Sequence, residues 1–155
     1  MVTNKKVYLT KQGLRELKKE YKELIEVKRP QFVVRISHAR EMGDLAENSD
    51  YQDARDKLRF LDDRIAELQK VLSKAVVVEK EKNPEKIGLG CRVSVRTNGK
   101  KQVFILVSEL EADPTSQKIS YQSPLGRAFM GKKVGEKVEV ATPSGKAVYK
   151  VEKIE

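Results

Sequence analysis

The sequence predicts an α+β protein, with a long helical hairpin first and a small, mostly antiparallel β-sheet carrying one short helix second. Apolar residues recur every three or four positions through the first half, and every second position after residue 90. These are the repeats of helices and of half-buried strands. Gly43 interrupts the helical half, and glycine often supplies the left-handed residue that ends a helix. We therefore expect two domains, 1–75 and 76–155, with the first folding back on itself.

The outgoing helical segment is expected to begin after Thr10, which suits an N-cap position. Its apolar stripe continues to a tip at residues 41–50. Pro30 removes one helical hydrogen bond and crowds the preceding turn. We therefore expect a kink or a restart near Lys28-Arg29.

The returning segment has the heptad spacing of a coiled-coil seam. Asp44, with Glu47 three positions later, has the spacing of a helix N-cap and capping box. A helix of roughly 28 residues from there is about 42 Å long at ~1.5 Å per residue. Folded back on the outgoing segment, it forms an antiparallel coiled coil. The seam positions are Tyr51, Ala54, Leu58, Leu61, Ile65, Leu68 and Leu72.

The second half has the pattern of strands and tight turns. Asn98-Gly99 is a strong signal for a two-residue hairpin turn, and the apolar run 103–107 is expected to be the central strand. Ser123-Pro124 has the pattern of an N-cap followed by proline at the first helical position. Further expected elements are strands at 76–78, 91–96 and 118–121, a short helix at 125–130 closed by Gly131, and a hairpin of strands near 138–140 and 147–151 across Pro143-Ser144-Gly145.

Composition points to a polyanionic partner, nucleic acid first, because the 155 residues carry a net charge of +9. No apolar run is long enough to span a membrane, and the N-terminus lacks the apolar core of a signal peptide. The single cysteine, Cys91, cannot form an internal disulfide. We therefore expect a cytoplasmic protein without a membrane partner.

The acidic residues at the tip allow two interpretations. Asp44 and Glu47 can be a capping box, worth about 1 kcal/mol. Alternatively, their carboxylates are hard-oxygen ligands for Mg²⁺. Two carboxylates cannot satisfy a six-coordinate ion alone, so in this interpretation they complete a metal site that belongs to another molecule.

Basic residues lie beside these acids. Arg40, Arg55 and Arg59 fall within about three helical turns of the tip. They form either a solvated face or a stripe that contacts phosphates. The low aromatic content argues against a platform on which bases stack. His38 is expected on a helix surface and Cys91 in a core. The sequence contains no Ser-His-Asp set, Gly-rich phosphate loop or Cys-x-x-Cys pair, and so no self-sufficient active site is recognisable.

The motifs taken together resemble the bacterial Gre transcript-cleavage factors, more the GreA type, over nearly the whole chain. The tip pattern Gly-Asp-Leu-x-Glu-Asn-x-x-Tyr is highly specific. The matching residues are Tyr8-Leu9-Thr10, Gly13, Leu17, Glu20, Arg29-Pro30, Ala39-Arg40-Glu41, Gly43-Asp44-Leu45, Glu47-Asn48, Tyr51, Arg64-Ile65, Ser123-Pro124-Leu125-Gly126, Gly131-Lys132 and Val134-Gly135.

The resemblance implies that the second domain is similar to FK506-binding proteins, and that the coiled coil enters the secondary channel of RNA polymerase. There Asp44 and Glu47 would help hold a second Mg²⁺ shared with the polymerase, and backtracked RNA would be cut near its 3′ end. The chain would thus activate another enzyme and hold no cofactor stably alone. By the same resemblance, Arg40 and Arg55 would steady the RNA. Ser123, Pro124 and Leu125 would dock the second domain at the channel rim.

The sequence departs from the family pattern at three places, and neither tip acid is affected. Met42 stands where histidine is frequent, Gln122 precedes Ser-Pro, and Lys57-Leu58 replaces a more polar pair. Three other functions stay open: a non-catalytic inhibitor in the same channel, a prolyl isomerase or chaperone, and a general basic nucleic-acid binder. We expect a monomer, although the exposed seam leaves a dimer open.

Overall fold

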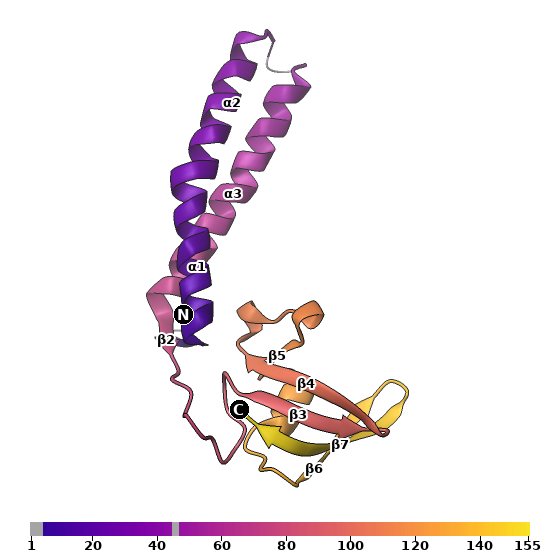
Figure 1. Ribbon diagram of the computed structural model, residues 1–155. Coiled ribbons are helices and arrows are strands. Elements are labelled where there is room, and N and C mark those ends of the chain that lie inside the picture. Colours follow the sequence, from indigo (N-terminus) through magenta and orange to yellow (C-terminus); the bar gives the residue numbers. More distant parts are fainter. Residues whose placement is uncertain (1–4, 45–46) are drawn as a thin grey trace. The chain divides into compact units, whose positions relative to one another are not determined.

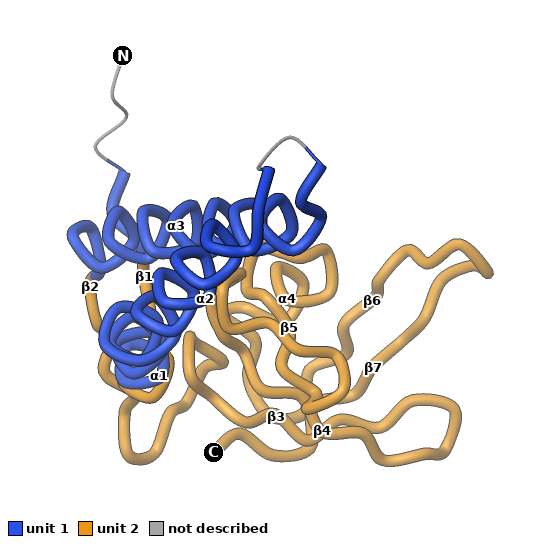
Figure 2. The backbone as a smooth tube through the Cα atoms, turned by 90° about the horizontal axis from the view of Figure 1, so that it is seen from above, with its two compact units in different colours: residues 1–7, 14–75 blue, residues 8–13, 76–155 orange. Residues whose placement is uncertain are grey.

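The structure is a computed structural model that describes residues 5–44 and 47–155. The chain divides into two compact units (Figure 2). The first comprises Met1–Val7 and Leu14–Ala75, and the second comprises Tyr8–Gly13 and Val76–Glu155.

Helices dominate the first unit. The outgoing arm consists of α1 (Lys11–Glu23), η1 (Leu24–Lys28) and α2 (Arg29–Glu41), and α3 (Ser49–Lys74) returns beside α2 (Figure 1). Thr10 caps α1 as predicted, since the backbone N–H of Gly13 donates to its Oγ1 at 3.0 Å.

The restart expected near Pro30 is confirmed, and it takes the form of a π-helical turn. η1 is this turn, and at its end the Arg29 N–H donates to the Leu24 carbonyl. In an α-helix the ring of Pro30 would clash with the carbonyl of Glu26, four residues earlier. The wider π-turn directly before it relieves that contact and lets the helix continue.

Apolar packing and ion pairs together set the antiparallel register of the hairpin. Three ion pairs join the outgoing and returning arms: Glu20–Arg64, Arg29–Asp62 and Arg35–Asp53. Their sequence separations fall from 44 to 33 to 18 towards the tip, as an antiparallel hairpin requires. The predicted seam is confirmed, because its residues in α3 are buried or half-buried. The buried side chains of the hairpin are Leu17, Leu24, Ala39, Ala54, Leu61 and Leu68.

A two-stranded sheet pairs β1 (Val7–Leu9) with β2 (Ala75–Val77), the apolar run that follows α3. The β2 run matches the short strand expected at 76–78. Its partner β1 was not predicted, because three residues carry too little periodicity.

The second unit contains a five-stranded sheet in the order β5-β4-β3-β7-β6. Only β4 and β5 run parallel, and the other neighbours are antiparallel. The prediction that residues 103–107 form the central strand is wrong: β3 lies at the centre, and the predicted run belongs to its neighbour β4. The strands are β3 (Arg92–Thr97), β4 (Lys100–Val107), β5 (Lys118–Ser120), β6 (Lys137–Thr142) and β7 (Gly145–Ile154).

The turns of this unit follow the sequence signals. Asn98 and Gly99 both have positive φ, at 51° and 75°, as a type I′ hairpin turn requires. Two short 3₁₀ turns, η2 (Glu109–Glu111) and η3 (Pro114–Ser116), link β4 to β5. The predicted short helix is α4 (Pro124–Phe129), and Gly131 follows with φ 78°.

The core of the second unit lies between α4 and the sheet. Phe129 is fully buried, and its ring centroid lies 5.7 Å from that of Phe104 and 5.6 Å from that of Tyr149. Val93 and Val95 from β3 contribute to the same core. Cys91 is buried there, as predicted.

Tyr8–Gly13 are held within the second unit by Glu111. Its carboxylate accepts hydrogen bonds from the N–H and hydroxyl of Thr10 and from the hydroxyl of Ser108. A side chain at Gly13 would meet this carboxyl group, so the flexible Glu111 side chain would have to shift to make room for it.

Candidate functional site

The hairpin tip places Asp44 and Glu47 outside any helix. α2 ends at Glu41, Met42 is its C-cap, and Gly43 has φ 129°. Asp44 and Glu47 follow, both exposed. Leu45, part of the tip motif, lies outside the described residues. The two carboxylates therefore sit on the segment that joins the helices.

The predicted capping box at the tip is wrong. The N-cap of α3 is Asn48, whose side-chain oxygen accepts a hydrogen bond from the Tyr51 N–H at 3.1 Å. Asn48 also donates from Nδ2 to the Ala39 carbonyl at 2.6 Å, which joins the two arms. Asn48 suits the N-cap position better than Asp44, because an asparagine side chain supplies both a hydrogen-bond donor and an acceptor where the chain reverses. N-capping of α3 thus does not explain the presence of Asp44 and Glu47.

The donor set at the tip fits a shared Mg²⁺ better than one bound by this chain alone. Mg²⁺ takes six oxygen ligands and keeps several waters. Within residues 5–44 and 47–155, no group of three or more His, Cys, Asp or Glu side chains could hold a metal ion. Asp44 and Glu47 can supply oxygens of the right kind, but only as part of a larger ligand set.

Two of the three predicted RNA-binding arginines meet in one groove, which we call the tip groove. It has a volume of about 490 Å³ and lies along α2 and α3. The Arg40 guanidinium carbon lies 5.8 Å from the ring centroid of Tyr51, within the range of a cation–π contact. Arg59 is exposed and does not line the groove. The lining residues are Val33, Ile36, Ser37, Arg40, Tyr51, Arg55 and Leu58.

Ion pairing separates the arginines of the hairpin into two groups. Arg29 and Arg35 are paired with Asp62 and Asp53. In the part of the chain that the structure describes, no ion pair involves Arg40, Arg55 or Arg59. These three arginines therefore lack an ion pair among the described residues.

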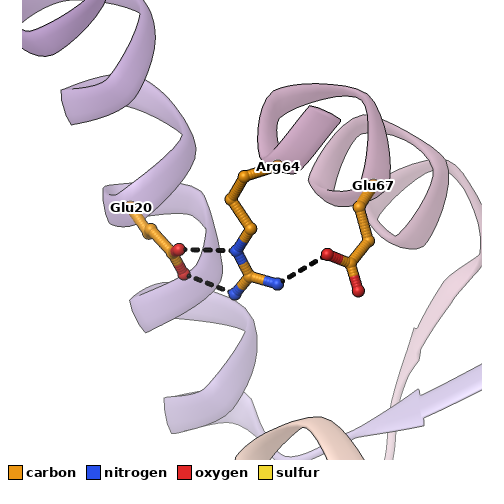
Figure 3. Close-up of polar contacts among 3 residues, drawn as sticks. All are labelled: Glu20, Arg64 and Glu67. Carbon is orange, nitrogen blue, oxygen red and sulfur yellow. Dashed lines mark hydrogen bonds and ion pairs between the residues drawn. The ribbon is translucent and has the colours of Figure 1, made fainter. Parts of the chain in front are cut away.

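At the other end of the hairpin, Arg64 ties α3 to α1. Its Nε and Nη2 donate to the two carboxylate oxygens of Glu20 at 2.8 and 3.0 Å, and its Nη1 donates to Glu67 at 2.9 Å (Figure 3). These contacts raise the pKa of Arg64, chiefly through the hydrogen bond to Glu20. The i,i+3 spacing from Arg64 to Glu67 is visible in the sequence. The contact to Glu20 needs the tertiary register.

The predicted docking residues have different surroundings. Ser123 caps α4: its hydroxyl accepts from the Gly126 N–H at 3.0 Å and donates to the Ser120 carbonyl at 2.6 Å. Pro124 is exposed, whereas Leu125 packs against the core. An added Cβ on Gly126 would collide with the backbone oxygen of Ser120, so the glycine of the Ser-Pro-Leu-Gly motif has a structural role of its own.

Two further expectations from the sequence concern His38 and membrane-spanning helices. His38 is exposed on α2, as expected of a helix-surface residue. None of the helices in the described part of the chain has the length and apolar character needed to cross a membrane.

Comparisons with known proteins match both units. The family described as "Transcription elongation factor, N-terminal" matches residues 7–77, and that described as "Transcription elongation factor, GreA/GreB, C-term" matches residues 81–155. Transcription elongation factor GreA of Syntrophomonas wolfei is 40% identical, covering 100% of this chain and 99% of the relative. The GreA protein of Nautilia profundicola is 42% identical, covering 94% and 92%.

Among solved structures, GreA factor homolog 1 (Gfh1) of Thermus thermophilus is 30% identical, with a TM-score of 0.46, covering 97% of this chain and 99% of that chain. The two family matches together span nearly the whole sequence. The chain therefore belongs to the GreA/GreB family of transcription elongation factors.

Proposed function

We propose that this elongation factor inserts its hairpin into the secondary channel of RNA polymerase and stimulates cleavage of backtracked RNA by the polymerase itself. One observation carries the proposal. Asp44 and Glu47 are exposed at the end of a long helical hairpin, and neither is the N-cap of α3. Family membership supports the same role in elongation.

The two helical arms hold these carboxylates at the far end of a long hairpin. α3 has 26 residues, which corresponds to about 39 Å at ~1.5 Å per residue. Ion pairs and buried leucines join the arms along this length. An acidic tip on such a hairpin can reach a recessed active site.

The chemistry at the tip is that of donated ligands. Asp44 and Glu47 would supply two oxygens to an Mg²⁺ whose remaining ligands come from the polymerase and water. When bound, such an ion would supply an activated water and would stabilise the charge that develops on phosphate. The chain's own task is to hold the two carboxylates in position, and it would act as an activator of the polymerase.

Two further contacts complete the proposal. Arg40 and Arg55 would hold phosphates of the extruded RNA, because both are exposed cations without an ion-pair partner among the described residues. Pro124, with Ser123 and Leu125 behind it, would dock the second unit at the channel rim. Pro124 is the exposed member of this trio.

Transcript cleavage tests the proposal directly. Polymerase is stalled and backtracked on 3′-labelled RNA, and the protein is added with Mg²⁺. We expect short 3′ fragments with wild type and a reduction of at least about 100-fold in rate with Asp44→Asn or Glu47→Gln, the order of loss seen when charge-stabilising groups are removed. Both substitutions keep the side-chain shape and remove the charge.

Asp50→Asn is the matched control, since Asp50 is an exposed acid in the first turn of α3. It should retain cleavage within about twofold, because it changes only a helix-terminus interaction of a few tenths of a kcal/mol. Full activity of both tip variants would refute the donated-ligand mechanism. Slowed elongation without fragments, even with wild type, would support the inhibitor alternative.

A further inference from the structure

The second unit carries a pocket on one face of its five-stranded sheet, which we call the sheet pocket. Its volume of about 500 Å³ lies within the range of small-molecule sites, about 300–1,000 Å³. Its lining comes from residues 10–12 and 78–80, from Gly90 and from β4 and β5, all within the second unit. Thr10 and Lys80 meet beside Gly90, since a Cβ built on this glycine would lie 3.7 Å from a side-chain atom of each. Chain segments that are distant in the sequence therefore enclose one space.

The floor of the sheet pocket is the face of β4 that points away from α4. Phe104 and Leu106 belong to the core between the sheet and α4, and successive residues of a strand point to opposite faces. Ile105 and Val107 therefore face the pocket, where the first is half-buried and the second is buried. Lys118 of β5 is the direct neighbour of Ile105 on β4, so its side chain stands on the same face. An apolar floor thus lies beside a cation.

The basic residues of the sheet pocket favour a phosphate. Among the described residues that line it, the basic ones are all lysines: Lys11, Lys80 and Lys118. None of the ion pairs in the described part of the chain involves them. Lysine binds phosphate as a point charge, whereas the planar fork of arginine suits a carboxylate. A phosphate ester also carries more charge than one carboxylate, and can therefore engage several lysines at once.

The acids in the lining leave the sheet pocket positive. Glu111 accepts hydrogen bonds from the N–H and hydroxyl of Thr10 and from the hydroxyl of Ser108. Its carboxylate is therefore engaged within the protein at the start of α1. Glu79 is an exposed acid in the lining. Three lysines against these two carboxylates give the lining a formal charge of +1.

We propose that the sheet pocket binds a small organic phosphate, with its apolar part on the floor of Ile105 and Val107 and its phosphate at the three lysines. An apolar floor beside several cations matches a ligand that has both parts. The pocket shares no lining residue with the tip groove. The inference therefore does not depend on the proposed cleavage function, and concerns a ligand site that belongs to the second unit alone.

The first experiment titrates phenyl phosphate, inorganic phosphate and phenol separately into the ¹⁵N-labelled full chain, and follows amide shifts by NMR. Phenyl phosphate has about ten non-hydrogen atoms, so a fitted site should bind it with a Kd of about 1–10 mM. We expect shifts at Gly90, Ile105 and Lys118, and binding at least about fivefold tighter than that of either fragment. Equal binding of phenyl phosphate and inorganic phosphate would overturn the inference, because the apolar floor would then contribute nothing. Absence of shifts at these residues would overturn it as well.

Two nearby lysines provide matched variants. Lys80 and Lys82 are both exposed on the same segment, but only Lys80 lines the sheet pocket. Lys80→Gln should weaken phenyl phosphate binding about tenfold, the order expected for loss of one hydrogen bond to a charged group. Lys82→Gln should change it by less than about twofold. Equal weakening by both variants would overturn the inference, because the general positive field of the protein would then account for binding.

Two residues of β4 provide the corresponding test of the floor. Val103 and Ile105 are both half-buried and lie two positions apart on one face of the strand, but only Ile105 lines the sheet pocket. Ile105→Thr should weaken phenyl phosphate about fourfold, as loss of apolar contact requires, and leave inorganic phosphate unchanged. Val103→Thr should change neither by more than about twofold. Equal effects would overturn the inference. Circular dichroism checks folding, and Ile105→Val with Val103→Ala serves if either variant does not fold.

The second experiment distinguishes a small phosphate from the phosphates of a nucleic acid. A single-stranded RNA hexamer without a terminal phosphate is titrated into the same protein. Its phosphodiesters carry one charge each, and we expect it to leave the amides of Gly90 and Ile105 unshifted. Shifts at these residues that Lys80→Gln abolishes would overturn the inference, because the sheet pocket would then be a nucleic-acid site.

Discussion

A single residue, Asn48, decides how the chain closes at the tip. It accepts a hydrogen bond from the Tyr51 N–H and donates one to the Ala39 carbonyl, so it caps α3 and joins it to α2. Asn48→Ala removes both bonds, and we expect the free energy of unfolding to fall by about 1–2 kcal/mol. Chemical denaturation followed by helical circular dichroism measures this loss.

Asn48→Asp is the informative control at the residue scale. A carboxylate keeps the N-cap acceptor but cannot donate to the Ala39 carbonyl. We expect its stability to lie between wild type and Asn48→Ala. Wild-type stability in Asn48→Asp would mean that the bond between the arms contributes no more than the aspartate charge gains at the helix N-terminus.

At the scale of the helices, the bidentate pair between Arg64 and Glu20 joins α3 to α1. The side chains are 38% and 39% exposed, so the solvent screens the interaction. We expect a coupling energy near the upper end for exposed pairs, about 1 kcal/mol, because the geometry is bidentate. A double-mutant cycle with Arg64→Met and Glu20→Gln measures it.

Arg29 and Asp62 provide the comparison, because the hydrogen bond between them, from Nε at 2.9 Å, is monodentate and their side chains are 46% and 44% exposed. Their coupling energy should be smaller, about 0.3 kcal/mol. Both energies should fall as salt is raised. A larger coupling energy for Arg29–Asp62 than for Arg64–Glu20 would contradict the expectation that Arg64–Glu20 is the stronger ion pair.

At the scale of the whole molecule, the net charge of +9 could be mistaken for general affinity for nucleic acid. The proposed RNA contact involves only Arg40 and Arg55, that is about two phosphates. We therefore expect weak binding of free single-stranded RNA, near the 10⁻⁴ M end of non-specific affinities, with a log–log salt slope of about −1.4. Fluorescence anisotropy across a salt series measures both quantities.

Substituting both arginines by alanine should bring that slope close to zero. Sub-micromolar affinity with a steep slope that survives the double substitution would instead favour a general basic nucleic-acid binder. Binding to RNA polymerase is measured in parallel, and we expect it to be the tighter interaction.

Patterns of local origin were predictable from the sequence alone. The heptad repeat indicated α3, Thr10 and Ser123 indicated two helix starts, and Asn98-Gly99 indicated a hairpin turn. Each of these signals depends on the spacing between residues no more than four positions apart, where the choice of residue limits the backbone conformation. The tip motif likewise indicated the family, because its residues lie close together in the chain.

Tertiary structure decided what depends on residues distant in the sequence. The N-cap of α3 is Asn48 and not the predicted Asp44, because Asn48 also reaches the Ala39 carbonyl across the tip. Tertiary structure placed β3 at the centre of the sheet, since strand order follows from pairing between distant segments. It brought Arg40 and Arg55 to one groove with Tyr51 and left Arg59 out. Local patterns constrain the backbone, but only the register of the packed arms determines which side chains share a surface.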